Sequence, residues 1–272
     1  MPGSNDVLTA LVAAAPDAAL AIETRGLSRR FGEQLAVDGI DLRVQRGSFY
    51  GFLGENGAGK STTISMLTGL LEPTAGEMRV LGLDLRRDTT AIKRRVGVVP
   101  DGLMLFTRLT GREQLVLVGR LFGIARVEAS ARADELLAAM ELTGHESKLI
   151  SDYSFGMKKK LSLACALIHG PELLFLDEPF EGVDAVAKAA LTALLADLVR
   201  RGKLTVFLTS HVLEVVEKLC THVGVIHHGR LIAQGTVAEV IACAPGAASL
   251  PAAFVQLVGD GRSAVRALSF LP

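Results

Sequence analysis

Tryptophan is absent from the 272-residue sequence, cysteine occurs three times, and neither sign of charge is in excess. The 29 lysines and arginines balance 29 aspartates and glutamates, so the formal net charge is zero. A protein that binds nucleic acid through its phosphates usually carries a basic surplus, and we therefore expect no nucleic-acid partner. Aromatic residues make up 5% of the sequence and hydrophobic residues 49%, so the apolar content is mostly aliphatic. This amount of apolar surface excludes disorder for the bulk of the chain.

The sequence also lacks an apolar run long enough to cross a membrane, although its mean hydropathy of +0.37 is high. A membrane-spanning helix needs about 20 mostly apolar residues. The longest uncharged stretch, Val240–Val258, contains Pro245 and Pro251, which break a helix where lipid could not satisfy the freed backbone groups. No lysine or arginine precedes Arg25, so the positively charged start of a secretory signal is missing. We therefore expect a cytosolic chain.

The cysteines carry no recognisable pattern. Cys165, Cys220 and Cys243 are odd in number and do not have the spacing of a metal site. A free cysteine usually behaves as a small buried apolar side chain. We expect three buried free thiols.

Strand-like and helix-like segments alternate along the chain, which is typical of a mostly parallel sheet with crossover helices. The apolar run at residues 47–53 fits a strand that is buried on both faces. The expected strands are residues 21–26, 35–44, 47–53, 96–99, 173–176, 205–209, 223–227 and 230–233, the last two forming a hairpin around Gly229. Helices are expected to begin near Lys60, to span about residues 185–201, and to begin near His211.

The segment from about residue 102 to 161 differs from the rest. Its apolar residues recur at spacings of three and four, as in Leu136, Leu137 and Met140, which indicates helices. We interpret this segment as a helical lobe inserted into the sheet domain.

The two ends of the chain are less regular than its middle. Residues 1–20 are rich in alanine and poorly patterned, and we expect a loose N-terminal arm. The main domain then covers residues 21–240, and residues 241–272 form a C-terminal tail. Within the tail, Ala253–Val258 can form a final helix, which either packs on the domain or contacts a partner.

A glycine-rich loop follows the apolar run at residues 47–53. The segment Gly54-Glu55-Asn56-Gly57-Ala58-Gly59-Lys60-Ser61 matches the phosphate-loop pattern G-x-x-x-x-G-K-[ST] at every fixed position. Glycines let the backbone curl so that its N–H groups point at phosphate oxygens, and the following helix N-terminus adds partial positive charge. Lys60 is expected to reach the β- and γ-phosphates of a nucleotide, and the Ser61 hydroxyl to hold Mg²⁺. The expected nucleotide-binding residues of this loop are Gly54, Asn56, Gly57, Gly59, Lys60, Ser61 and Thr62. The alternative of an ordinary glycine-rich turn is disfavoured by the strand before it and the helix after it.

Two acids, Asp177 and Glu178, follow the short apolar strand at residues 173–176. Ligands of open parallel sheets bind at the carboxyl ends of the strands. Asp177 is suited to hold Mg²⁺ through water, and Glu178 is suited to polarise a water molecule that attacks the γ-phosphate. A solvated acidic loop is the alternative, and the presence of the phosphate loop disfavours it.

With both motifs in place, the chain resembles the ATP-binding cassette (ABC) ATPases, the nucleotide-binding subunits of ABC transporters. The resemblance covers about residues 21–240, and its motifs occur in the family's order. Phe31 matches the aromatic residue that stacks on adenine, Asp101 falls at the Q-loop, residues 154–157 match the signature loop, residues 182–184 match the D-loop, and His211 matches the switch histidine. The resemblance implies an α/β fold of the P-loop NTPase (RecA-like) type, with a mostly parallel core sheet, an antiparallel β subdomain and the inserted helical lobe.

The resemblance also implies a mechanism and partners. Two cassettes, expected to form a homodimer, would face each other head to tail and hydrolyse ATP with Mg²⁺. Lys60, Glu178 and His211 would act catalytically, and Ser61, Asp101 and Asp177 would surround the metal. Ser154 and Gly156 would contact the γ-phosphate bound by the other chain, and Asp184 would connect the two sites. The helical lobe would dock on a separate integral membrane permease, which would hold the chain peripherally at the cytoplasmic face of the plasma membrane.

Two positions depart from the family's commonest residues. Asp101 replaces the Q-loop glutamine, and a charged carboxylate cannot donate a hydrogen bond, although it can bind a metal shell. Phe155 replaces a glycine of the signature loop, so that position must tolerate a side chain. A bulky residue there resembles the branch that serves exporters whose permeases are separate chains.

Three functions remain open at this point. The first is an ATPase subunit that powers a separate permease, with export favoured over import. The second is an ABC ATPase acting on ribosomes, DNA or an assembly pathway, which the single cassette and zero net charge disfavour. The third is a regulator that binds nucleotide without hydrolysing it, which Lys60, Glu178 and His211 disfavour.

Overall fold

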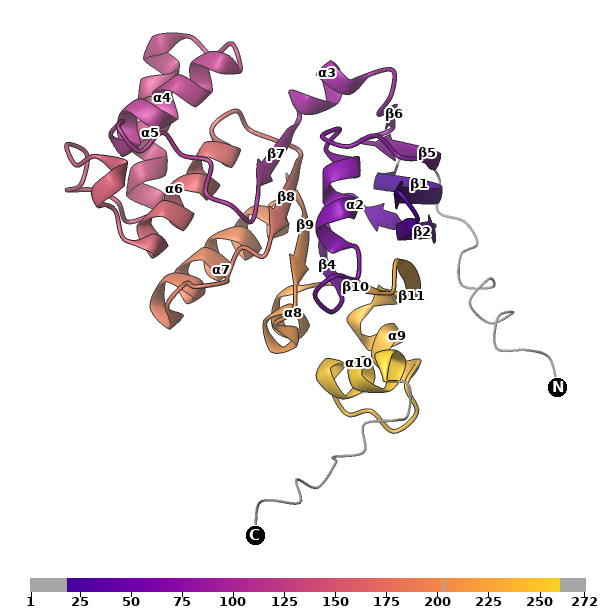
Figure 1. Ribbon diagram of the computed structural model, residues 1–272. Helices are drawn as coiled ribbons and strands as arrows, with labels where there is room; N and C mark the ends of the chain where they lie inside the picture. Colours follow the sequence, from indigo (N-terminus) through magenta and orange to yellow (C-terminus); the bar gives the residue numbers. More distant parts are fainter. Residues whose placement is uncertain (1–18, 203, 260–272) are drawn as a thin grey trace, which may run out of the picture.

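Figure 1 shows a computed structural model of the chain, which describes residues 19–202 and 204–259. Within these ranges the strands form two sheets. The antiparallel sheet has β1 (Leu20–Phe31), β2 (Gln34–Ile40), β3 (Arg43–Gln45), β5 (Ala75–Val80) and β6 (Leu83–Asp84). The second sheet runs in the order β11 (Arg230–Thr236), β10 (His222–His227), β4 (Phe49–Leu53), β9 (Thr205–Ser210), β8 (Leu173–Asp177) and β7 (Val96–Val99). Its neighbouring strands are parallel except for the antiparallel β10–β11 hairpin.

The helices follow one another in three groups along the chain, which the colours of Figure 1 trace. The first is α2 (Lys60–Leu67), between the two sheets, with the short α3 (Thr89–Lys93) preceding β7. The second is the group beyond β7 with α4 (Gly111–Leu121), α5 (Arg126–Ala139), a short 3-10 turn (Ile150–Asp152) and α6 (Phe155–Leu167). The third group follows β8, with α7 (Ala185–Arg200), α8 (Leu213–Leu219), α9 (Val237–Ala242) and α10 (Leu250–Val258). Among the residues that the structure describes, no helix combines the length and apolar character of a membrane span.

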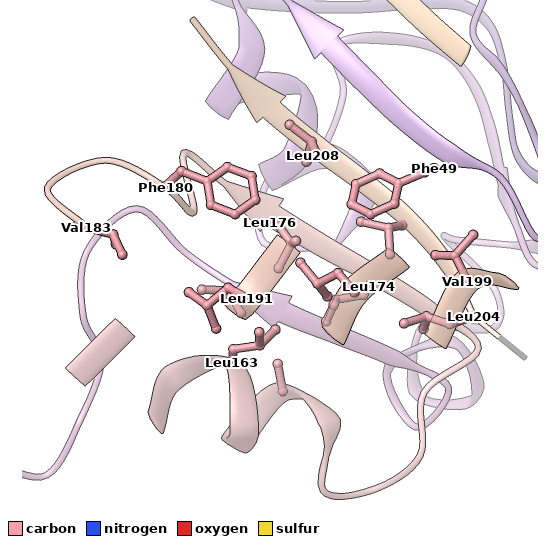
Figure 2. Packing of buried hydrophobic residues seen from close by; sticks show 14 of the residues in the cluster. Phe49, Leu163, Leu174, Leu176, Phe180, Val183, Leu191, Val199, Leu204 and Leu208 are labelled. Atoms are coloured by element: carbon pink, nitrogen blue, oxygen red, sulfur yellow. The ribbon is translucent and has the colours of Figure 1, made fainter. Parts of the chain in front are cut away.

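The parallel strands are buried on both faces because alternate side chains enter different cores. In β4, Phe49 and Leu53 join the core that α6 and α7 cover, and Figure 2 shows Phe49 in that core. Tyr50 and Phe52 point to the opposite core, which is shared with the antiparallel sheet and α2. The prediction of a doubly buried parallel strand at this position is confirmed, and the strand delivers the chain directly to the glycine-rich loop.

The strands near the N-terminus differ from the sequence prediction in their bounds. The expected strand at residues 21–26 continues to Phe31, and the expected strand at 35–44 is divided into β2 and β3. The cause is that β2 pairs with the second half of β1 and β3 with its first half, so the chain changes partner position near Asp41. Asp41 Oδ1 accepts a hydrogen bond from Gly26 N at 2.6 Å and holds this junction. The expected arm at residues 1–20 lies outside the described residues except for its last two, and Leu20 begins β1.

The helices predicted for the middle segment are present, with residues 102–109 irregular. Thr110 starts α4 with a capping box, in which its hydroxyl accepts from Glu113 N and the Glu113 carboxylate accepts from Thr110 N. Helix α6 runs past residue 161, where the lobe was expected to end, and packs on β7. One helix therefore belongs to both the lobe and the core sheet.

The prediction of three buried thiols is wrong for one of them. Cys220 is buried and Cys165 is half-buried, and burial raises the pKa of the Cys165 thiol to about 12. Cys243 is exposed because it follows the short surface helix α9, whose buried contact is made by Val240. Cys243 is thus the thiol that reagents in solution reach.

The predicted helix in the tail is present as α10, and it packs against α8 and α9. Leu250 is completely buried there, and Ala253 is as well. We expect Leu250→Ala to lower the free energy of unfolding by about 2–4 kcal/mol, because it removes buried methyl groups and leaves a cavity. Urea denaturation followed by circular dichroism measures this. The matched control is Val255→Ala on the exposed face of the same helix, which should cost little. A similar loss in both variants would contradict the packing of α10.

Candidate active site

The glycine-rich loop is held in a narrow space between β2 and the β10–β11 hairpin. Gly59 precedes α2 with φ of 109°, and a Cβ atom there would lie 2.6 Å from the Ala36 carbonyl oxygen. A Cβ atom at Gly54 would lie 2.5 Å from the carbonyl oxygen of Ile226. Both positions therefore require glycine, for backbone conformation at the first and for close approach at both.

Lys60 is the buried cation of this loop, with 6% of its side chain exposed. Its Nζ donates to the carbonyl oxygens of Gly54 at 2.7 Å and Glu55 at 3.1 Å. The carboxylate of Glu178 lies 3.7 Å away through Oε1. The ammonium group is thus folded onto its own loop, from where it can exchange these carbonyls for phosphate oxygens.

Asp177 lies at the end of β8 opposite the loop. Its Oδ1 accepts hydrogen bonds from Thr209 Oγ1 at 2.6 Å and from Ser61 Oγ at 3.3 Å. Thr209 is the register partner of Asp177 on β9, and its hydroxyl also accepts from Glu178 N at 3.1 Å. Thr209 was not predicted from the sequence, although its place at the end of an adjacent parallel strand was a usable signal. It orients both acids from a completely buried position.

Glu178 has an uncommon backbone, with φ of 46°. A non-glycine residue in this left-handed region costs about 1 kcal/mol or more, so the surrounding contacts must hold it there. Its Oε2 lies 3.0 Å from His211 Nδ1. Its Oε1 is buried and accepts no hydrogen bond from the described part of the chain. A carboxylate with one free buried oxygen, beside a cation, is able to take a proton from a bound water molecule.

His211 lies in the turn between β9 and α8, and not in the helix that was expected to begin near it. Helix α8 begins at Leu213, with Val212 as its N-cap. The imidazole is 45% exposed and contacts Glu178 through Nδ1. Its role is therefore not that of a helix cap, and its ring is directed at the acid pair.

These elements surround an open cleft of about 570 Å³. Most of the nucleotide and metal ligands predicted from the sequence line it: Phe31, Asn56, Gly57, Gly59, Lys60, Ser61, Thr62, Asp101, Glu178 and His211. Gln34, Ala36 and Glu181 also line it and were not predicted. Gly54 and Asp177 lie just behind this lining, bonded to Lys60 and Ser61 respectively.

At the mouth of the cleft, Phe31 presents an aromatic face to solvent. Its side chain is 45% exposed at the end of β1. The Arg29 guanidinium, two residues earlier on the same face of the strand, lies 4.6 Å from the ring centroid. This cation–π contact supports the ring and leaves an apolar surface for stacking a planar base.

The signature-loop and D-loop residues form a second group, which does not line the cleft in the described part of the chain. Ser154 caps α6 by accepting from Met157 N at 3.2 Å. Asp184 accepts from Ala187 N at 3.0 Å in the first turn of α7. The two loops touch, because a Cβ atom at Gly156 would lie 3.6 Å from Asp184 Oδ2. Within one chain the cleft residues therefore lie together, and Ser154, Gly156 and Asp184 lie apart from them.

Phe155, the departure in the signature loop, is accommodated by a glycine in the D-loop. Its ring covers Gly182, where a Cβ atom would lie 2.7 Å from Phe155 Cε1. Gly182 has φ of 67°, which also favours glycine. The Phe155 ring therefore fits because Gly182, which it covers, has no side chain.

The three lysines after the signature loop, residues 158–160, point in different directions from α6. Successive residues of a helix are turned by about 100°, so three in a row cannot point the same way. Lys158 Nζ donates to Ser151 O at 3.2 Å, and Lys160 Nζ pairs with Glu141 Oε2 at 2.7 Å. Lys159 points inward and is buried.

The donors at the base of the cleft fit a magnesium ion that is shared with a nucleotide. Within residues 19–202 and 204–259, no group of three or more histidine, cysteine, aspartate or glutamate side chains is placed to hold a metal alone. Mg²⁺ usually binds through one or two protein oxygens, with water and substrate phosphates completing its shell. Ser61 Oγ and Asp177 Oδ1, 3.3 Å apart beside the phosphate loop, supply such a pair of oxygen donors.

Comparisons with known proteins agree with this geometry. The family model for "ABC transporter" matches residues 37–181. The bacitracin transport ATP-binding protein BcrA of Bacillus licheniformis is 39% identical over 211 residues, which cover 78% of this chain and 68% of that protein. The Nod factor export ATP-binding protein I of Paraburkholderia xenovorans is 40% identical over 222 residues, 82% of this chain and 73% of that protein.

Similarity in three dimensions extends over nearly the whole described chain. A solved ATP-binding subunit of an ABC transporter superposes with a TM-score of 0.81 and 31% sequence identity, covering 87% of this chain and 99% of that one. The predicted P-loop NTPase fold is thereby confirmed, and so are ATP as the nucleotide with Mg²⁺ and ATP hydrolysis as the activity. The chain belongs to the ABC transporter family, as an ATP-binding subunit of its exporter branch.

Proposed function

We propose that two copies of this chain bind ATP between them and use its hydrolysis to power a separate membrane permease that exports a compound. The single observation that carries the proposal is the cleft, which gathers an aromatic platform, a phosphate loop, an acid and a histidine from separate segments. Export is favoured by similarity to proteins whose names refer to bacitracin transport and Nod factor export. The permease would hold the chain at the cytoplasmic face of the plasma membrane.

Within one chain, we assign binding to the phosphate loop and proton transfer to the acid. Phe31 stacks on adenine, and Lys60 leaves the Gly54 and Glu55 carbonyls to bind the β- and γ-phosphates. Glu178 accepts a proton from the attacking water through Oε1, its unbonded oxygen. His211, now bonded to Glu178 Oε2, turns to donate to the γ-phosphate when that phosphate enters.

Ser61, Asp177 and Asp101 are assigned to the metal. The first two supply adjacent oxygen donors, and Asp101 lines the same cleft from the loop after β7. When bound, Mg²⁺ neutralises charge that develops on the phosphate oxygens. Thr209 positions Asp177 for this role through its 2.6 Å hydrogen bond.

The second copy completes the site. Ser154, Gly156 and Asp184 lie together at the N-termini of α6 and α7 and apart from the cleft lining. Two chains placed head to tail bring the Ser154 hydroxyl and the Gly156 N–H of one chain to the γ-phosphate held by the other. Helix α6 contributes the partial positive charge of its N-terminus at the same point.

The permease contact is assigned to the helical lobe. Several large apolar side chains of the lobe are exposed, on α4, on α5 and on the irregular segments around them: Met104, Phe106, Leu121, Phe122, Val127 and Leu149. Exposed apolar residues concentrated on one region mark a protein–protein contact. Residues 102–109 connect this surface to Asp101 in the cleft, which links docking to hydrolysis.

The experiment that tests the two-chain site uses Glu178→Gln, which we expect to bind ATP without hydrolysing it. With ATP this variant should run as a dimer in light scattering after gel filtration. Adding Gly156→Asp should prevent the dimer and leave ATP binding by the monomer intact, because the new carboxylate repels the γ-phosphate across the interface. A chain that stays monomeric with ATP, even when the permease is supplied, would sink the two-chain mechanism.

Asp101→Gln is expected to raise ATP turnover. An ionised carboxylate repels the γ-phosphate when the metal is absent and cannot donate a hydrogen bond to the attacking water, whereas glutamine can. Phosphate release at saturating ATP and Mg²⁺ measures the change. Glu181→Gln removes a charge from the same cleft at another position and serves as the control. Unchanged or lower turnover of Asp101→Gln, with normal ATP affinity, would contradict the role given to Asp101.

A further inference from the structure

Lys159 is a buried cation with no acid to pair with among the described residues. Only 3% of its surface is exposed, whereas Lys158 and Lys160 beside it in α6 reach polar partners at the surface. Its stem lines a small cavity of about 10 Å³ together with apolar side chains that include Leu163 and Leu176. Burying an ammonium group is costly unless strong polar contacts compensate it, so its retention at this position calls for an explanation.

The contacts of the Lys159 ammonium join three motifs. Its Nζ donates to the carbonyl oxygen of Asp101 at 3.4 Å and to that of Glu178 at 3.5 Å. It also lies 5.6 Å from the centroid of the Phe155 ring, four residues earlier in the same helix. The Q-loop position, the catalytic acid and the signature loop thus meet at one side chain.

Both hydrogen bonds are long. The usual N···O separation is about 2.9–3.0 Å, so these two are at the weak end of the range. A shift of α6 toward the ends of β7 and β8 by about half an ångström would bring them to full strength. In the low-dielectric interior such contacts strengthen steeply as they shorten.

The backbone at Glu178 is where such a contact has most effect. Its φ of 46° is strained, and the orientation of its carboxylate follows from that conformation. The Glu178 carbonyl oxygen accepts from Lys159 and its N–H donates to Thr209, so the peptide groups on both sides of its Cα atom are held in this conformation. The side chain then keeps Oε1 toward Lys60 and Oε2 toward His211.

We propose that Lys159 is a positioning residue that links the position of the signature helix to the catalytic geometry of Glu178 and Asp101. This inference rests on the role proposed for Glu178. When α6 approaches the sheet, the ammonium group draws both carbonyl oxygens into place, and Glu178 is held for proton transfer. When α6 withdraws, these contacts weaken, and turnover falls while nucleotide binding in the cleft is unaffected. Hydrolysis is thereby tied to the state of the lobe.

The test compares Lys159→Met and Lys159→Gln with the wild-type chain. Methionine keeps the apolar stem and removes the charge and donors, and glutamine keeps one weaker donor. We expect kcat for ATP hydrolysis to fall about tenfold or more in Lys159→Met, because displacement of a catalytic group by about 1 Å costs up to about 100-fold. Lys159→Gln should lie between it and wild type. The KM for ATP should change less than twofold in both, since Lys159 does not line the nucleotide cleft.

Lys158→Met is the matched control, because it removes the neighbouring lysine from the surface of the same helix. Its kcat should equal that of wild type. Thermal unfolding separates function from folding, and Lys159→Met should be at least as stable as wild type because it replaces a buried unpaired charge. Should Lys159→Met fail to fold, Lys159→Gln decides alone. A folded variant with kcat within twofold of wild type, or with KM raised as much as kcat is lowered, overturns the inference. Wild-type hydrolysis and its loss in Glu178→Gln test the proposed function separately.

Discussion

Lys60→Met is expected to weaken ATP binding by about 10- to 100-fold. A hydrogen bond to a charged group contributes about 1.5–3 kcal/mol, and each 1.4 kcal/mol changes affinity tenfold. Lys60 is the cation of the phosphate loop, and its Nζ already lies within the loop, 2.7 Å from the Gly54 carbonyl oxygen. Methionine has nearly the same length and packs in the same space. The loss of ATP affinity therefore measures the effect of removing the charge, and not a collapse of the loop.

Isothermal titration with ATP measures this change in the Glu178→Gln background, so that the nucleotide is not consumed. Lys93→Met is the control, because Lys93 is an exposed lysine at the end of α3. Affinity should be unchanged in that variant. A Lys60→Met chain that binds ATP like its parent would exclude the glycine-rich loop as the phosphate site.

Glu178→Gln should reduce ATP turnover by about 100- to 10,000-fold, the usual range for loss of a general base. The amide is the same size as the carboxylate and preserves a contact with His211, which the carboxylate makes at 3.0 Å. It cannot accept the proton of the attacking water. Removing the carboxylate also removes its repulsion of the incoming γ-phosphate, so ATP affinity should be equal or higher.

Turnover is followed as phosphate release at saturating ATP and Mg²⁺. Glu181→Gln is the matched control, since Glu181 lies three residues later in the same loop and also lines the cleft. We expect it to retain most of the activity. Comparable losses in both variants would mean that the cleft depends on its total negative charge and that Glu178 has no special role.

Much of the site was predictable because the family's motifs are short and local. The loop from Gly54 to Ser61 specifies its own backbone conformation through glycine and the start of a helix, and the structure has it as expected. Asp177 and Glu178 follow four consecutive apolar residues, 173–176, which predict the buried strand β8. Parallel strands place their carboxyl ends at one edge, so the pattern predicted that the glycine-rich loop and the acid pair share that edge. The position of β9 between β4 and β8 comes from the structure.

The residues that were missed act through contacts between distant segments. Thr209 looks like an ordinary strand residue until its register with Asp177 is known. Lys159 belongs to a run of three lysines that resembles a solvated surface, and only the way in which α6 packs on β7 buries the middle one. The exposure of Cys243 likewise depends on which face of α9 packs inward.

The sequence by itself determined the phosphate loop, the acid pair, the order of the motifs and the alternation of strands and helices, because each depends on residues close together in the chain. The tertiary structure decided which of these residues share a cleft within one chain. It set Phe31, Lys60, Asp101, Glu178 and His211 around one space and placed Ser154, Gly156 and Asp184 elsewhere. It also decided that the carbonyls of Asp101 and Glu178 meet one buried ammonium group. Such contacts depend on how whole helices and sheets pack, and packing is a property of the assembled core that no local pattern contains.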